Sequence, residues 1–307
     1  MKKLNFSTLL SALFLSIFIS VAWCAEQEEK VVKIAYLPIT HSLALLEEAK
    51  ELSQKEGVKI ELVRYGSWPE LLDALNSGRV DGASVLIELA MKSKQEGAAI
   101  KAVALGHKDG NVIVVSKKID SVKDLKGKTF AIPHRQSSHH ILLRDALAKG
   151  GLSIDDIKVI ELPPTEMPSA LASGVIDGYC VAEPFGAVGV SIGAGKVLYT
   201  SEELWENSLC CALVFNEKFI NTRRKDAKAI LDGYKIAGAN LDKVKAKEVA
   251  KEFFKQKDEI LDISLQWISY DNLEITKEIY EILYDKVKQY GLSNNPPKYE
   301  EFVLSEI

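Results

Sequence analysis

Two similar stretches decide the fold: ALNSGRVDGASV at residues 74–85 and ALASGVIDGYCV at residues 170–181. They lie 96 residues apart and are identical at seven of twelve positions, which chance explains poorly. Each stretch reads as a helix end, then a glycine suited to a left-handed cap (Gly78, Gly174), then a short strand that opens with Asp and Gly. The chain therefore contains an internal repeat.

The repeat extends upstream of both stretches. The apolar runs at residues 31–38 and 128–133 each lead through a loop into a helical pattern, and residues 59–63 and 157–162 are strand-like in their β-branched content. Each half thus alternates strand, helix, strand, helix, strand. This α/β alternation predicts two lobes, each a mostly parallel sheet with covering helices.

The rest of the chain predicts how the lobes connect. Further strand-like runs cover residues 101–107, 111–118, 196–200 and 210–215, and residues 222–291 have apolar residues at helical spacings of three and four. We expect lobe one to hold residues 31–116 and 213–307, with the C-terminal helices packed on it, and lobe two to hold residues 117–212. Two crossing strands would then form the hinge.

The N-terminus predicts export. Lys2 and Lys3 precede an apolar run at residues 9–19 and the small residues around Ala22 and Cys24, the order of a secretory signal at residues 1–25. We favour simple cleavage before Ala25, which gives a periplasmic or other extracytoplasmic protein. The alternatives are a lipid anchor on Cys24 and an uncleaved membrane anchor, for which the apolar run is short.

Charge and cysteine content narrow the classes further. The net charge is −4 and the basic residues are spread along the chain, so no nucleic-acid partner is expected. Beyond the signal lie Cys180, Cys210 and Cys211, an odd number without a CxxC pattern. A disulfide scaffold is therefore not indicated, at least one thiol stays free unless it pairs between chains, and Cys180 is expected to be buried and unreactive.

Ligands of open α/β sheets bind beyond the carboxyl ends of parallel strands, so the loops at these ends should line a cleft between the lobes. Hydroxyl and aromatic candidates there are Thr40, Ser67, Trp68, Ser84, Ser137, Ser138 and Phe185. Helix N-termini in the same loops favour anions or electron-rich rings. The alternative for the serines is capping their own helices, and for Trp68 it is packing.

All five histidines fall in or next to these loops: His41, His107, His134, His139 and His140. They suit hydrogen bonding to an oxyanion or heterocycle, or coordination of a transition metal, and the third possibility is incidental placement. Glu183 follows a strand and precedes Pro184, where its carboxylate could accept from a ligand N–H, bind a cation, or accept from backbone N–H groups at the hinge.

A set of motifs resembles one known family: AYLPITHSLALLEEA, YGSWPELLDALNSGRVDGASV, SVKDLKGKTFAIP, SSHHILLRDALAKGGL and DGYCVAEPF. They are similar to ABC-importer solute-binding proteins for nitrate, sulfonates, taurine, bicarbonate and the thiamine pyrimidine precursor. The resemblance implies a type II periplasmic-binding fold that closes on its ligand. It also implies delivery of a small molecule to an ABC permease, with no cofactor and no chemistry on the ligand, by a protein that we expect to be a monomer.

Carried over by motif, the family's cleft positions fall on His41, Trp68, Ser84, His134, His139 and Glu183. The histidine-rich PHRQSSHH loop departs from nitrate and alkylsulfonate patterns, so the ligand stays open between an oxyanion, a sulfonate or a pyrimidine. One rival is a transition metal held by His41, His134, His139 and Glu183. Others are an enzyme on the same fold, of the pyrimidine-precursor or menaquinone-pathway type, and a sensor subunit.

Overall fold

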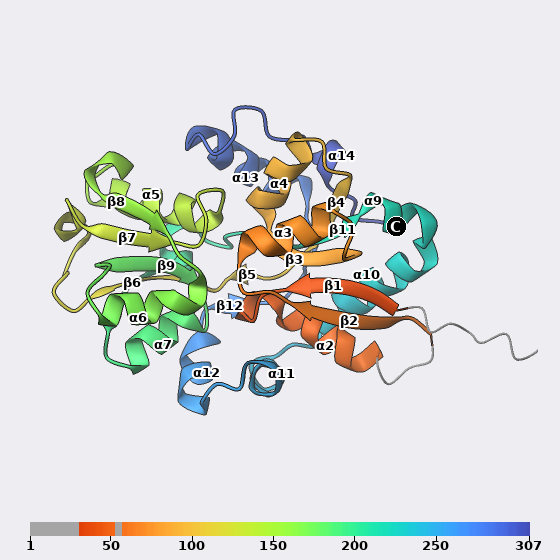
Figure 1. The fold of residues 1–307 in the computed structure, drawn as a ribbon, viewed down its shortest axis with the longest axis horizontal. Helices are drawn as coiled ribbons and strands as arrows, with labels where there is room; N and C mark the ends of the chain where they lie inside the picture. The colour runs from red at the N-terminus through yellow and green to blue at the C-terminus, as the bar shows by residue number, and fades with distance from the viewer. Residues whose placement is uncertain (1–30, 53–56) are drawn as a thin grey trace, which may run out of the picture.

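The computed structural model describes residues 31–52 and 57–307. The expected signal peptide and Cys24 lie outside these residues. Two five-stranded sheets lie side by side, each with helices on its faces (Figure 1). Within the described part of the chain, no helix is both long enough and apolar enough to cross a bilayer.

The first sheet, the base of lobe one, has the order β2-β1-β3-β11-β4. Strands β1, β2 and β3 run parallel, and β11 runs antiparallel between β3 and β4. The strands are β1 (Val31–Tyr36), β2 (Lys59–Arg64), β3 (Gly82–Leu86), β4 (Ile100–Leu105) and β11 (Cys211–Asn216). The intervening helices are α2 (Leu43–Leu52), α3 (Trp68–Asn76) and α4 (Ile87–Gln95).

The second sheet, the base of lobe two, repeats this pattern with the order β8-β7-β9-β6-β10. Its strands are β6 (Asn111–Ser116), β7 (Thr129–Ile132), β8 (Lys158–Glu161), β9 (Gly178–Ala182) and β10 (Gly195–Thr200). Its helices are α5 (Ser138–Lys149), α6 (Met167–Ala172), α7 (Phe185–Ser191) and α8 (Ser201–Leu204). The predicted repeat of strand, helix, strand, helix, strand is present in both lobes.

The structure moves the predicted lobe boundary. Strand β6, expected at the end of lobe one, pairs antiparallel with β9 and β10 in the second sheet, so the chain enters lobe two at Gly110 rather than near Ser116. The whole of β11, from Cys211, belongs to lobe one rather than only the part from residue 213. We call residues 106–110 and 205–210, which lead from one sheet to the other, the crossing segments.

The C-terminal region is helical as predicted but contacts both lobes. Helices α9 (Glu217–Thr222), α10 (Arg224–Ala239) and α11 (Lys243–Phe254) lie on lobe one, where α10 and α11 pack against α2. Helix α12 (Asp258–Ser264) packs on α7 of lobe two, and β12 (Ile268–Ser269) pairs with β5 (Lys108–Asp109) of a crossing segment. Helices α13 (Lys277–Gln289) and α14 (Tyr299–Phe302) return to lobe one through Leu304, whose N–H bonds the Ala102 carbonyl.

Candidate functional site

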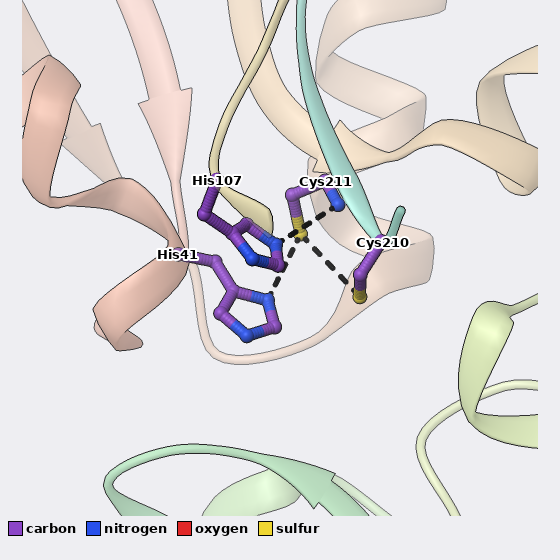
Figure 2. Close-up of side chains that lie close together, drawn as sticks. All are labelled: His41, His107, Cys210 and Cys211. Atoms are coloured by element: carbon purple, nitrogen blue, oxygen red, sulfur yellow. Dashed lines mark hydrogen bonds between the residues drawn. The ribbon is translucent and has the colours of Figure 1, made fainter. Parts of the chain in front are cut away.

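His41 lies on a 3-10 turn, Thr40–Ser42, directly after β1 and between the buried apolar residues Ile39 and Leu43. Its Nε2 lies 3.1 Å from the Gly110 carbonyl oxygen. Because a carbonyl only accepts, Nε2 carries a hydrogen, which leaves Nδ1 as the ring nitrogen that can contact another group. That Nδ1 lies 3.6 Å from the sulfur of Cys211 (Figure 2).

His107 lies on the first crossing segment, directly after Gly106. A Cβ on Gly106 would lie 2.9 Å from the His41 carbonyl oxygen and 3.1 Å from that of Cys211, so only glycine lets these segments approach so closely. The His107 ring stacks on His41 with centroids 3.4 Å apart. The Cys211 N–H donates to His107 Nε2 at 3.3 Å.

Cys210 and Cys211 stand where the second crossing segment becomes β11. Both are fully buried, and their sulfur atoms lie 3.9 Å apart. The backbone is fixed on both sides, because the Cys210 carbonyl accepts from Ile87 and the Cys211 carbonyl accepts from Gly106. Figure 2 shows the four side chains of His41, His107, Cys210 and Cys211 gathered into one group.

This group, which we call the His2Cys2 cluster, is a candidate metal site. One ligand atom from each of its residues lies within 4.8 Å of all the others. With Zn–S near 2.3 Å and Zn–N near 2.0–2.1 Å, a tetrahedron has edges of about 3.8 Å between sulfurs and about 3.6 Å between sulfur and nitrogen. The corresponding distances here are 3.9 Å (Cys210 to Cys211) and 3.6 Å (Cys211 to His41).

The electrostatics of the cluster favour one thiolate. Burial opposes ionisation of Cys210, but Cys211, His139, His41 and His107 together hold its pKa well below the ordinary value. Burial and the neighbouring Cys210 raise the pKa of Cys211 well above its ordinary value. Burial lowers the pKa of His107 to about 4, so this imidazole is neutral at pH 7, and its one ring lone pair, on Nε2, accepts from the Cys211 N–H.

Lobe two faces the cluster with the N-terminus of α5. Ser137 caps this helix by accepting from the His140 N–H, while Ser138 and His139 are fully buried. Among the described residues, neither ring nitrogen of His139 nor the Ser138 hydroxyl has a hydrogen-bond partner. Buried polar atoms are normally bonded, so these groups are candidates for contact with a ligand.

Thr40 and Glu183 join the lobes beside the cluster. The N–H and the hydroxyl of Thr40 both donate to the Glu183 carbonyl oxygen, at 2.8 and 3.0 Å. The Glu183 carboxylate accepts from the Ala187 N–H at 2.8 Å and from the Ser264 hydroxyl at 3.4 Å. Burial raises the pKa of Glu183 to about 7, against the lowering effect of these donors.

Several predicted site residues have local roles. Trp68 is 2% exposed within the lobe-one core, Ser84 accepts from the Ser42 hydroxyl, and Phe185 is a buried residue at the start of α7. Ser67 is the N-cap of α3, although its side chain makes no capping bond. His134 accepts from the Gln136 N–H at 2.9 Å, and His140 contacts the Arg135 carbonyl and the Arg144 guanidinium.

The structure therefore brings together a different set of candidate metal ligands from the one predicted. Of His41, His134, His139 and Glu183, only His41 belongs to the His2Cys2 cluster. Cys210 and Cys211 were missing from the predicted set. The sequence signal that could have found them is the adjacent thiol pair at the start of a strand that crosses between lobes.

Comparison with known proteins gives the chain its relatives. A family model described as the NMT1-like family matches residues 25–254. A ligand-binding component of an ABC-type import system from Staphylococcus aureus, solved with zinc bound, is 42% identical, with a TM-score of 0.87, and the match covers 90% of this chain and 97% of that one.

Two curated relatives extend this picture. The taurine-binding periplasmic protein of Escherichia coli is 29% identical over 73% of this chain and 72% of its own length. The nitrate import ATP-binding protein NrtC of Synechocystis sp. is 30% identical over 63% of this chain. The chain spans about a third of the length of NrtC.

Proposed function

Since the chain belongs to the NMT1-like family, we propose that it is an extracytoplasmic substrate-binding protein that encloses a small solute between its lobes and delivers it to an ABC permease. The import-system component from S. aureus and the periplasmic taurine binder support this role. The geometry supports it too, because His41, His107 and His139 are fully buried between the two sheets and a ligand there could enter only when the lobes open.

The cargo that fits the geometry best is a thiophilic transition metal ion, Zn²⁺ or Cu⁺. The single observation that carries this is the His2Cys2 cluster, whose Cys210–Cys211 sulfur distance and Cys211–His41 sulfur–nitrogen distance match two edges of a metal tetrahedron. Thiolate and imidazole are the ligands that these ions prefer. The zinc bound to the S. aureus relative is consistent with this cargo.

The surroundings of the cluster favour a bound cation. Metal-ligating histidines usually donate their second ring N–H to a carbonyl or carboxylate, and His41 does so to Gly110. Two thiolates would balance the charge of Zn²⁺, which removes most of the cost of burying it. Coordination would replace the thiol protons, so uptake of the metal would release protons.

The second candidate is a small organic anion or oxyanion in the same cleft. The names of the nitrate and taurine relatives favour it, as do the unpartnered His139 and Ser138 groups at a helix N-terminus. In this case the cluster would be a packing feature. We further propose that no chemistry is done on the ligand, which incubation with each bound ligand and analysis for products would test.

The first experiment measures zinc affinity of the exported protein, purified under reducing conditions and stripped of metal, by competition with a chromophoric chelator. We expect tight binding of one zinc ion, and Cys210→Ser or Cys211→Ser to weaken it more than 100-fold, since even outer-shell changes cost about 10- to 100-fold. Cys180→Ala is the matched control, because Cys180 is equally buried but outside the cluster.

The same preparation is screened by thermal shift against nitrate, bicarbonate, taurine, alkylsulfonates and pyrimidines. A ligand at 100 times its dissociation constant adds about 2.7 kcal/mol of stability. A shift with one of these classes and none with zinc would replace the metal by that solute and leave the importer role standing. Binding of neither class would overturn both candidates.

A further inference from the structure

Cys210 and Cys211 place two thiols in contact with each other. The three cysteines of the described chain are free and buried, and Cys180 lies in the apolar core of lobe two. The Cys210 and Cys211 sulfurs are 3.9 Å apart. In a regular strand, neighbouring side chains point to opposite faces of the sheet. These two can meet because β11 begins only at Cys211, so the backbone at Cys210 is not yet part of the strand.

The distance between the two sulfurs permits a covalent bond after a small movement. A disulfide bond is about 2.0 Å long, so the sulfurs would have to approach by about 1.9 Å. The backbone opposes the bond more than the side chains do. Neighbouring Cα atoms are about 3.8 Å apart, whereas disulfides usually join Cα atoms at least about 4.4 Å apart. A disulfide between Cys210 and Cys211 would therefore be strained and easily reduced.

Hydrogen bonds hold the peptide groups around this pair in their present form. The Cys210 carbonyl accepts from the Ile87 N–H at 2.8 Å, and the Cys211 carbonyl accepts from the Gly106 N–H at 2.7 Å. The peptide that joins the two cysteines donates its N–H to His107 Nε2 at 3.3 Å. Closing a disulfide ring through this peptide would disturb these bonds. The fold therefore favours the dithiol whenever a reductant is present.

We propose that Cys210 and Cys211 are a site of reversible oxidation, and that a disulfide between them prevents the His2Cys2 cluster from holding its cargo. Thiolates are the sulfur ligands of metal ions, so the oxidised cluster would keep at most its two imidazoles. A bound metal ion would in turn protect both sulfurs from oxidation. This inference rests on the metal cargo proposed above and adds the regulation of that site.

The oxidant that fits is a small-molecule disulfide, R–S–S–R, because the buried sulfurs can be reached only through the opening between the lobes. One cysteine sulfur attacks this disulfide, forms a mixed disulfide and releases the first R–SH. The neighbouring sulfur then displaces the second R–SH and closes the Cys210–Cys211 bond. Two electrons pass from the cysteine pair to the oxidant, and the two thiol protons leave on the released thiols.

The experiment treats the metal-free exported protein with oxidised glutathione and records its intact mass, its circular dichroism and its zinc affinity by chelator competition. We expect the mass to fall by two hydrogens, with no glutathione retained and the folded spectrum kept. Zinc should bind more than about 100-fold more weakly, since the loss of one outer-shell partner already costs about 10- to 100-fold. Dithiothreitol should restore both the mass and the affinity.

Cys180→Ala is the matched control, because it removes the other described cysteine and leaves the cluster intact. It should lose two hydrogens as the unchanged protein does, and protein loaded with zinc beforehand should not. Thiols that stay unmodified, glutathione that stays attached, or unfolding on oxidation would overturn the proposed switch and leave the metal cargo standing. Equal oxidation of the zinc-loaded and metal-free proteins would overturn it as well. A disulfide that forms in a protein unable to bind zinc when reduced would instead overturn the cargo, and with it the regulation.

Discussion

Lobe one and lobe two have the same strand order but differ in the side chains at their functional positions. Their sheets have matching orders, and the repeat makes the same bonds in each. The Asp81 carboxylate accepts from the Lys33 N–H at 2.9 Å, and the Asp177 carboxylate accepts from the Thr129 N–H at 2.9 Å. These acids tie the first strand of each repeat to the turn before the third strand of that repeat.

The chemistry is not repeated. The antiparallel strand of lobe one begins with Cys211, preceded by Cys210, whereas that of lobe two begins with Asn111, preceded by Gly110. Lobe one and the crossing segments thus contribute the four residues of the His2Cys2 cluster, whereas lobe two contributes Glu183 and the unpartnered His139. The comparison teaches that a duplicated scaffold can carry different functional groups when the residues at its crossing strands and strand-end loops differ.

The largest expected difference between the lobes concerns Glu183, because the equivalent position in lobe one is Ile87, which cannot ionise. Burial raises the pKa of Glu183 to about 7, so the folded metal-free protein holds a proton that the unfolded chain releases near pH 4.5. The stabilisation by this proton is complete below pH 4.5 and is lost as the pH rises to 7. A shift of this size corresponds to up to about 3 kcal/mol.

Urea unfolding of the metal-free protein between pH 4.5 and 8 measures this effect. We expect the stability of the unchanged protein relative to Glu183→Gln to fall with rising pH up to about 7 and then to level off. Glu166→Gln, at an exposed position of lobe two, is the control and should leave the profile unchanged. A constant difference between the unchanged protein and Glu183→Gln across this range would show that the carboxyl is ionised throughout.

Gly82 and Gly178 occupy equivalent positions of the repeat, so substituting each of them tests whether the two lobes are packed alike. A Cβ on Gly82 would lie 2.7 Å from a Phe215 ring carbon, and one on Gly178 would lie 2.8 Å from a Phe130 ring carbon. Each would also approach a carbonyl oxygen of the adjacent antiparallel strand, at 3.0 and 3.1 Å. Gly82→Ala and Gly178→Ala should therefore each destabilise the protein by about 2 kcal/mol, the usual size of core overpacking.

Denaturant midpoints of the two alanine variants provide the measurement, with Gly66→Ala as the control because its Cβ would meet nothing within 4 Å. A similar loss of stability in both variants would show that the two sheets are packed equally tightly at this position. A loss of stability in one variant alone would show that they are not, because the aromatic neighbour in the other lobe would then have room to move.

The sequence predicted the scaffold better than the site. The repeat, the alternation of strands and helices along each half and the helical C-terminus follow from local patterns. The histidine-rich loops lie at strand ends, as predicted. The position of β6 could not be read locally, because it depends on pairing with β9, 67 residues further on. The same holds for the cluster, since β11 brings Cys211 to Gly106 and His41 across more than 100 residues.

The smallest expected effect concerns Asp145, whose substitution tests how strongly α5 of lobe two is bonded to the C-terminal helix α13. On α5, its carboxylate accepts from Lys286 Nζ at 2.9 Å and from the Tyr290 hydroxyl, while α13 itself is anchored in lobe one. The pair is 14% and 20% exposed, so we expect Asp145→Asn to cost less than about 1 kcal/mol of closure. Zinc affinity should fall a few-fold at low salt and less at high salt, because screening already weakens the pair. Asp232→Asn breaks an exposed pair within α10 and is the control. An unchanged affinity in Asp145→Asn would mean that the bonds of Asp145 to α13 form equally in the open and closed states and do not contribute to closure.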